Sequence, residues 1–225
     1  DPNSEKDKKE RGENIFHIYL TEDMRGKSFL DFGCGEGHVA AAAALSDAKP
    51  NKVVGYDIVQ SGNQLRWEDD ADGYLLTTDY QKVASNGPYD VILLYDVLDH
   101  ASEETPGKIA AKVKELLKPD GIVYVRCHPW CARHGGHLYR TLNKAFAHLV
   151  FTEDELKLLN VEGEIPTQKV IHPIATYVEW FTEGNLKVKS QDIDVQVPED
   201  FFNDKEVITN RIRDNLRSST NGPFR

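Results

Sequence analysis

Long apolar runs are missing from the sequence. None approaches the roughly 18–20 residues that a membrane-spanning helix needs, and the N-terminus lacks the apolar core of a signal peptide. Cysteine is scarce, with three residues in 225, and an odd number favours a reducing compartment over a disulfide framework. Net positive charge is also lacking, because 27 Lys and Arg stand against 37 Asp and Glu and the formal net charge is −10. These absences disfavour a membrane protein and a general nucleic-acid binder, which needs clustered Lys and Arg, and they indicate a cytoplasmic protein.

The ends of the chain are polar. Residues 1–13, DPNSEKDKKERGE, are strongly charged, and we expect them to form a disordered leader. The chain begins with Asp1 rather than methionine, which favours a processed product or a domain excised from a larger protein. Residues 199–225 are expected to form a C-terminal helix and tail. The chain as a whole is 40% apolar, which is ordinary for a globular protein.

Strands and helices are expected to alternate along the first 127 residues. The clearest strand is the apolar run YDVILLYD, and the clearest helix, TPGKIAAKVKELLKPDG, carries its apolar residues on one face. Five alternations with short connections predict an α/β fold with a doubly wound, mainly parallel sheet and helices on both faces. The expected strands are 27–32, 52–57, 73–79, 89–96 and 122–127, and the expected helices are 14–24, 38–47, 61–69, a short one after the third strand, and 105–121.

Beyond residue 128 the pattern is looser. Helices are predicted over 137–148, 152–159 and 172–184, and one strand is predicted over 185–198. With a single good strand in this part, the sequence leaves the far edge of the sheet undefined.

The segment LDFGCGEGHVA (30–40) places glycines at alternate positions directly after a predicted strand. In open parallel sheets, ligands bind at the carboxyl ends of the strands, and glycines let the backbone turn tightly and approach them. The dinucleotide fingerprint needs a glycine where this chain has His38, and no Gly-Lys-Ser/Thr follows the turn. Both phosphate-binding motifs therefore fail, and the turn indicates another ligand.

The charges at the strand ends indicate what that ligand is. The first four predicted strands end near Asp31, Asp57, Asp79 and Asp96, with no Lys or Arg expected beside them. A pyrophosphate there would be repelled by about 1 kcal/mol or more per carboxylate at ~4 Å. S-adenosylmethionine carries a sulfonium, an ammonium group and a ribose diol, and these groups suit an acidic crevice.

Several segments resemble, in order and spacing, the class I S-adenosylmethionine-dependent methyltransferases. FLDFGCGEG resembles their glycine motif, VVGYDI and LLTTDY resemble the acidic ends of strands two and three, and YDVILLYDVLDHA resembles the strand-four segment. LLKPDGIVYV resembles the helix, turn and strand that follow, so the resemblance covers roughly residues 25–127. It implies a seven-stranded type of sheet in a domain over 14–198, with a helical insertion at about 128–171. It also implies S-adenosylmethionine as cofactor and S-adenosylhomocysteine as product.

The resemblance implies a set of cofactor contacts. The glycines of the turn would let the backbone approach the methionine part, Asp57 would accept from the ribose hydroxyls, and Asp79 would accept from the adenine amino group. Taken alone, one of these aspartates could instead cap a helix. The full set is Asp31, Gly33, Cys34, Gly35, Gly37, Asp57, Ile58, Asp79, Tyr80, Tyr95 and Asp96.

Histidines gather after the fifth predicted strand, in RCHPWCARHGGHLY. One of them could serve as the general base for a protonated methyl acceptor, and the candidates are His128, which is nearest the strand end, His134 and His137. A metal site of His128, Cys131, His134 and His137 is a minor alternative, because their spacing matches no common zinc pattern. A third interpretation is a polar loop whose histidines make local hydrogen bonds. His100, after the fourth strand, could face the pocket or pack beneath it.

The motifs of some acceptor classes are missing. The Asn/Asp-Pro-Pro-Tyr/Phe motif of amino-methylating nucleic-acid enzymes is absent after the fourth strand, and the Lys-Asp-Lys-Glu set of ribose 2′-O-methyltransferases is not evident in order. We therefore expect methyl transfer to an oxygen or nitrogen of a small molecule, without a membrane partner. Two alternatives stay open: a nucleic-acid or RNA-cap methyltransferase domain excised from a larger protein, and a non-catalytic S-adenosylmethionine-binding partner protein of the same fold.

Overall fold

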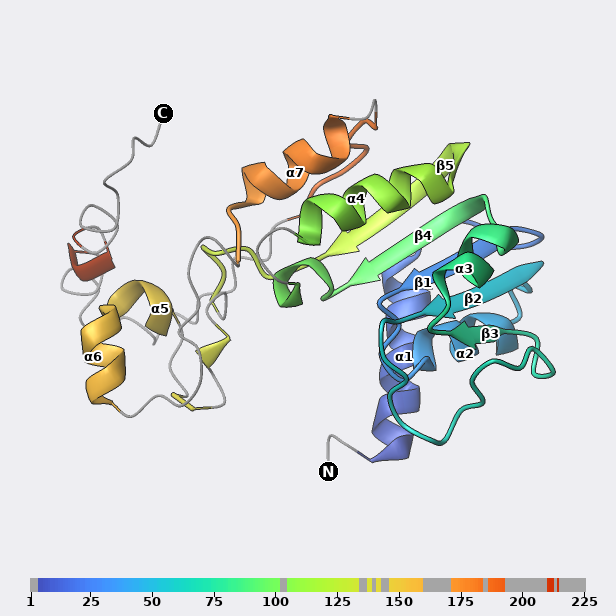
Figure 1. Cartoon of the computed structure of the whole chain (residues 1–225), viewed down its shortest axis with the longest axis horizontal. Helices are drawn as coiled ribbons and strands as arrows, with labels where there is room; N and C mark the ends of the chain where they lie inside the picture. The colour runs from blue at the N-terminus through green and yellow to red at the C-terminus, as the bar shows by residue number, and fades with distance from the viewer. Residues whose placement is uncertain are drawn as a thin grey trace. The chain divides into compact units, whose positions relative to one another are not determined.

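The computed structural model of the chain describes residues 4–101, 105–133, 137–138, 141–142, 146–159, 171–183, 186–192, 210–212 and 214. The chain divides into two compact units (Figure 1). Unit 1 comprises Asp1–Leu98 and Gly107–Cys127, and unit 2 comprises Asp99–Pro106 and His128–Arg225. Within the described part of the chain, no helix combines the length and apolarity needed to cross a membrane.

Unit 1 contains a five-stranded sheet in which every neighbouring pair of strands is parallel. The strand order is β3-β2-β1-β4-β5, so the chain starts in the centre, runs to one edge and then crosses to the other. This arrangement confirms the predicted α/β class with a parallel sheet, with five strands among the described residues. The strands are β1 (Ser28–Phe32), β2 (Lys52–Tyr56), β3 (Leu75–Thr77), β4 (Tyr89–Tyr95) and β5 (Leu117–Arg126).

Helices cover both faces of this sheet (Figure 1). Right-handed connections place a helix on one face while the chain moves from β1 toward β3, and on the opposite face once the chain reverses toward β5. Accordingly, α1 and α2 share one face, and α3 and α4 share the other. The bounds are α1 (Glu5–Tyr19), α2 (His38–Leu45), α3 (Tyr80–Asn86) and α4 (Thr105–Leu116).

The N-terminal segment differs from the prediction of a disordered leader over 1–13. Helix α1 begins at Glu5, and Ser4 caps it by accepting from the backbone N–H of Asp7 at 3.2 Å. The helix is stabilised at its far end, where Ile15 and Phe16 are buried. Several of the charged residues are exposed, while Lys8 pairs with Glu36, so their composition alone gave a wrong indication of disorder.

A helix was also wrongly predicted over 61–69, which is irregular in the structure. Gly62 and Glu68 have positive φ angles, of 68° and 62°. The backbone N–H of Glu68 donates to the carbonyl of Leu76 at 2.7 Å, and its carboxylate accepts from the Thr77 hydroxyl at 2.7 Å. These contacts tie Glu68 to β3 and, with the two positive φ angles, are incompatible with a continuous helix.

Two further boundaries differ from those predicted in the second half of unit 1. The helix expected to reach residue 121 ends at Leu116, and β5 begins at Leu117, before Pro119. A register shift between Tyr89 and Val91 of β4 absorbs the extra residues of β5.

Unit 2 contains the short helices α5 (Ala147–Val150), α6 (Glu153–Leu158) and α7 (Ile174–Thr182). They confirm the helices predicted over 152–159 and 172–184. The described residues of 137–148 reach a helix only at Ala147, and residues 186–192 form no strand. Residues 193–198 and most of 199–225 lie outside the described residues, and 210–212 are helical.

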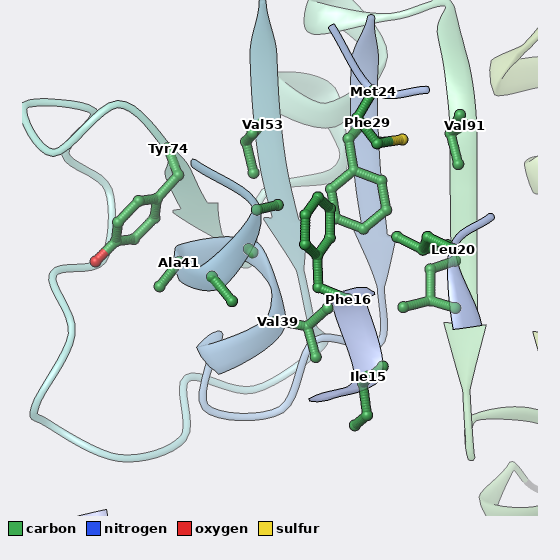
Figure 2. Close-up of a cluster of buried hydrophobic side chains, with 14 of the residues drawn as sticks. Ile15, Phe16, Leu20, Met24, Phe29, Val39, Ala41, Val53, Tyr74 and Val91 are labelled. Atoms are coloured by element: carbon green, nitrogen blue, oxygen red, sulfur yellow. The ribbon is translucent and has the colours of Figure 1, made fainter. Parts of the chain in front are cut away.

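An apolar cluster joins α1 and α2 to the sheet (Figure 2). Phe16 of α1 packs edge-on against Phe29 of β1, with ring centroids 6.0 Å apart. Ala40 and Ala43 of α2 are fully buried, so this helix presents a face of small side chains to the cluster. The close packing of α1 on α2 fixes the position of α1 above the start of the glycine segment.

Gly12 is the closest point of this packing and generates a stability prediction. A Cβ added at Gly12 would lie 2.6 Å from the carbonyl oxygen of His38. Gly12→Ala should gain up to about 1 kcal/mol of helix propensity, yet we expect a net loss of about 1–3 kcal/mol from overpacking. Thermal unfolding of this variant and of the exposed control Glu10→Ala would check this, and a raised melting temperature for Gly12→Ala would contradict it.

Candidate cofactor and catalytic sites

The glycine turn follows β1, and its three glycines have positive φ angles of 81°, 55° and 87° at Gly33, Gly35 and Gly37. A Cβ at Gly33 would lie 2.4 Å from Val97, and a Cβ at Gly37 would lie 2.4 Å from Leu76. A Cβ at Gly35 would meet nothing within 4 Å. The outer two glycines are therefore required by packing, whereas Gly35 presents open backbone to a ligand.

Asp57 ties this turn to the end of β2. Its Oδ2 accepts from the backbone N–H of Gly35 at 2.8 Å, and its Oδ1 accepts from the N–H of Ile58 at 2.7 Å. A carboxylate oxygen can accept more than one hydrogen bond, so both oxygens retain capacity for ligand hydroxyls. The Ile58 side chain is 80% exposed and offers an apolar surface next to this carboxylate.

Asp31 is a buried carboxyl group whose Oδ2 has no hydrogen-bond partner among the described residues. Burial raises the pKa of Asp31 to about 7, and the nearby Asp57 adds to the increase. A buried carboxyl group with one oxygen that lacks a hydrogen-bond partner suits a cationic ligand group, because a positive charge would offset the cost of ionising it. Burial also raises the pKa of the neighbouring Cys34 thiol, which is therefore neutral and no nucleophile.

Asp79 and Tyr80 start helix α3. Asp79 caps this helix by accepting from the backbone N–H of Gln81 at 2.8 Å. Asp79 is therefore one aspartate of the set that caps a helix, which was the alternative considered from the sequence. The Tyr80 ring packs edge-on against Tyr56, with centroids 5.9 Å apart, and Lys112 Nζ lies 4.4 Å from its centroid. These contacts fix both residues at the end of β3.

Asp96 corrects the expectation that no basic residue accompanies the acidic strand ends. Arg126, the last residue of β5, forms an ion pair with the Asp96 carboxylate, and the Asp96 N–H donates to the Arg126 carbonyl at 2.8 Å. The Arg126 guanidinium also lies 4.8 Å from the ring centroid of Tyr95. The pairing of β4 with β5 brings these residues together, so Arg126 is identified only once the strand order is known. The acidic character of the crevice is therefore greatest at Asp31 and Asp57.

A second cluster, within unit 2, surrounds the buried side chain of Asp99. Its Oδ2 accepts from the backbone N–H of His128 at 3.1 Å and lies 3.2 Å from His128 Nδ1 and 3.3 Å from His137 Nε2. Burial acts to raise the pKa of Asp99, but hydrogen bonds from His128 and His137 hold it below the usual range. The ionised Asp99 carboxylate contacts the Nδ1 side of the His128 ring and so orients this ring.

The structure brings two of the three candidate catalytic histidines together. The His128 and His137 ring centroids are 5.8 Å apart, and His134 lies outside the described residues. Asp99 was missed by the sequence analysis, although YDVLDHA places it next to His100. Asp99 is recognised as part of the cluster only through its contact with His128, which lies 29 residues further along the chain.

The proposed metal set of His128, Cys131, His134 and His137 gains little from the structure, because Cys131 is exposed and His134 is not described. Single ligand atoms of Asp99, His100 and His137 do lie within 4.8 Å of one another. Asp99 Oδ2, however, already holds the imidazole groups of two histidines. This pairing favours proton transfer as the chemistry of the cluster.

The pKa of Asp31 generates a prediction for stability against pH. Its folded-state value of about 7 lies above the ordinary value of 3.8, so the native protein binds this proton more tightly than the unfolded chain does. The stabilising contribution is complete below pH 3.8 and is lost as the pH rises to about 7. Asp31→Asn should remove this loss and exceed the wild type in stability by roughly 2–4 kcal/mol at pH 8.

Denaturant unfolding of the wild type and of Asp31→Asn from pH 4 to 8 would measure the difference in their free energies of unfolding. Asp47→Asn, at an exposed aspartate, is the control. A difference between wild type and Asp31→Asn that does not change with pH would show that Asp31 ionises normally in the folded protein.

Comparison with known proteins agrees with this geometry. A family model described as a methyltransferase domain matches residues 9–162. The ubiquinone biosynthesis O-methyltransferase of Actinobacillus pleuropneumoniae is 28% identical over 173 residues, which cover 72% of this chain and 66% of that protein. The Pasteurella multocida protein of the same name is 26% identical over 175 residues, with the same coverage of both chains. The chain thus spans slightly less than two thirds of the length of these relatives.

Among solved structures, the cyclopropane synthase MmaA2 from Mycobacterium tuberculosis superposes with a TM-score of 0.53 at 15% identity, covering 92% of this chain and 68% of that one. At this identity the likeness concerns the fold alone. The family model covers more than half of the chain and includes the glycine turn and all five strands. The chain therefore belongs to the methyltransferase domain family of class I, whose members use S-adenosylmethionine.

Proposed function

We propose that the chain is an S-adenosylmethionine-dependent O-methyltransferase acting on a hydroxyl group of a small molecule. The observation that carries the acceptor chemistry is the contact between Asp99 Oδ2 and His128 Nδ1, which orients a base. The names of the matching relatives, which are O-methyltransferases, support oxygen rather than nitrogen as the accepting atom.

The residues at the strand ends fit the proposed cofactor. Asp57 would accept from the ribose hydroxyls, Asp31 would compensate the ammonium group, and the backbone at Gly35 would lie along the methionine part. Asp79 and Tyr80 would contact the adenine from the start of α3. When bound, the cofactor supplies a methyl group activated on a positively charged sulfur.

The chain itself supplies orientation and a place for a proton. As the acceptor oxygen is methylated, its proton passes to Nε2 of His128, and the ionised Asp99 stabilises the resulting imidazolium. Asp99 follows the last residue of β4, Tyr95, by four positions, and His128 follows the last residue of β5, Arg126, by two.

We further propose a cytoplasmic location, supported by the three free cysteines Cys34, Cys127 and Cys131. The two alternatives from the sequence remain outcomes of the tests below. A nucleic-acid methyltransferase would methylate RNA or DNA and no small hydroxyl compound. A non-catalytic binding protein would bind the cofactor without any dependence of turnover on His128.

The cofactor site is tested first by calorimetric titration with S-adenosylmethionine. Asp57→Ala should bind about 10- to 100-fold more weakly than the wild type, because it loses charge-assisted hydrogen bonds and frees the Gly35 N–H. Asp47→Ala, an exposed aspartate after α2, is the control. Equal affinity in Asp57→Ala and wild type would place the ribose elsewhere.

The base is tested by steady-state kinetics on a panel of small hydroxyl compounds. His128→Ala should lower kcat by about 10²- to 10⁴-fold while leaving cofactor affinity unchanged. Asp99→Asn should lower kcat in the same direction, because it no longer fixes the ring as a charged acceptor. His17→Ala, on the exposed side of α1, is the control. Full turnover in His128→Ala would exclude this residue as the base.

A further inference from the structure

An ion pair connects the glycine turn to the N-terminal helix α1. Lys8 of α1 donates from Nζ to both carboxylate oxygens of Glu36, each at 2.9 Å. Glu36 is the charged residue inside the turn GCGEG, between Gly35 and Gly37. The two partners are 28 residues apart in the chain, so this contact connects α1 directly to the turn.

The pair is better placed than an ordinary surface ion pair. The side chains of Lys8 and Glu36 are only 20% and 30% exposed, and both carboxylate oxygens are used. Glu5 adds a second carboxylate 3.2 Å from Lys8 Nζ, and His38 Nε2 lies 3.5 Å from Glu36. These bonds lower the pKa of Glu36 and raise that of Lys8. A network of this kind is the case in which partly exposed pairs contribute measurably.

Both sides of the pair pack against other parts of the chain. On the helix side, Gly12 packs against the backbone of His38, and Phe16 is buried in the apolar cluster of Figure 2. On the other side, Gly62 approaches Glu36 so closely that a Cβ there would lie 2.9 Å from its Oε2. Gly62 belongs to the segment that follows Asp57. Glu36 therefore stands between α1 and the chain that leaves the proposed ribose carboxylate.

Additional restraints matter for this turn because its glycine content makes it conformationally free. Gly33, Gly35 and Gly37 give it high conformational freedom in the absence of other restraints. A ligand that binds a mobile turn must compensate the entropy lost on ordering it, and prior ordering strengthens binding. The hydrogen bond from Gly35 to Asp57 restrains one side of the turn, and the next residue in the chain, Glu36, offers a second restraint.

We propose that Lys8 is a positioning residue for cofactor binding, which acts through Glu36 to hold the glycine turn in its binding conformation. The inference deepens the proposed function, since it rests on the cofactor site described above. Lys8 itself makes no contact with the reacting atoms in this proposal. Its effect should therefore fall on cofactor affinity, with little change in kcat at saturating cofactor.

The test is calorimetric titration of the full chain with S-adenosylmethionine. Lys8→Met should bind about fivefold more weakly than the wild type, and Lys8→Arg, which keeps the charge, should restore most of the affinity. Lys9→Met is the matched control, because Lys9 is 68% exposed on the same helix and pairs only at 3.9 Å with Glu13. Lys9→Met should bind like the wild type.

A double-mutant cycle separates positioning from general stability. If Lys8 acts through Glu36, Lys8→Met should have no further effect on affinity in a Glu36→Gln background. A merely structural role would lower the melting temperature of Lys8→Met and leave its affinity intact. Unchanged affinity in Lys8→Met, or additive losses in the double variant, would overturn the proposal while leaving the cofactor site in place. Absence of binding by the wild type would overturn both proposals.

Discussion

The hydrogen bond from the Gly35 N–H to Asp57 Oδ2, at 2.8 Å, is the contact on which the rest of the proposed cofactor site depends. It joins the turn after β1 to the end of β2, and these two strands are parallel neighbours in the centre of the sheet. Gly33 and Cys34 reinforce the junction by donating to the carbonyl of Tyr56 at 2.7 and 2.9 Å. The sheet thus sets the position of the glycine turn. It also sets the positions of the two groups proposed to face the ligand, the Gly35 backbone and the Asp57 carboxylate.

The carboxylates at the strand ends divide by their partners. Asp79 caps a helix and Asp96 is paired with Arg126, so each has a structural role that needs no ligand. Asp31 is buried with an oxygen that lacks a partner in the described structure, and its raised pKa measures the cost of ionising it there. A protein retains such a cost where function requires it, because an apolar residue would be more stable in the same place. Among the aspartates at the strand ends, Asp31 is therefore the one whose presence is least explained by contacts within the protein.

The sequence predicted what depends on local pattern. Apolar runs and glycine punctuation gave all five strands, because parallel strands are buried on both faces. The helix predicted over 61–69 is absent because Gly62 and Glu68 take positive φ angles and the Glu68 N–H donates to Leu76 of β3, a long-range contact that no local pattern reveals. The contacts within the candidate sites were even harder to predict from the sequence. Each joins residues that are 28 to 30 positions apart, namely Lys8–Glu36, Asp99–His128 and Asp96–Arg126. Such pairs depend on which strands and helices become neighbours.

The geometry at Asp99 bears on the accepting atom. A neutral amine attacks with its lone pair and loses its proton afterwards, so a fixed base helps it little. A phenolic hydroxyl with a pKa near about 10 is mostly protonated at neutral pH, and it becomes a strong nucleophile only as its proton leaves. A histidine whose Nδ1 contacts an ionised carboxylate suits that need, because the carboxylate orients its ring. The Asp99–His128 pair is therefore better suited to an oxygen acceptor than to a nitrogen acceptor.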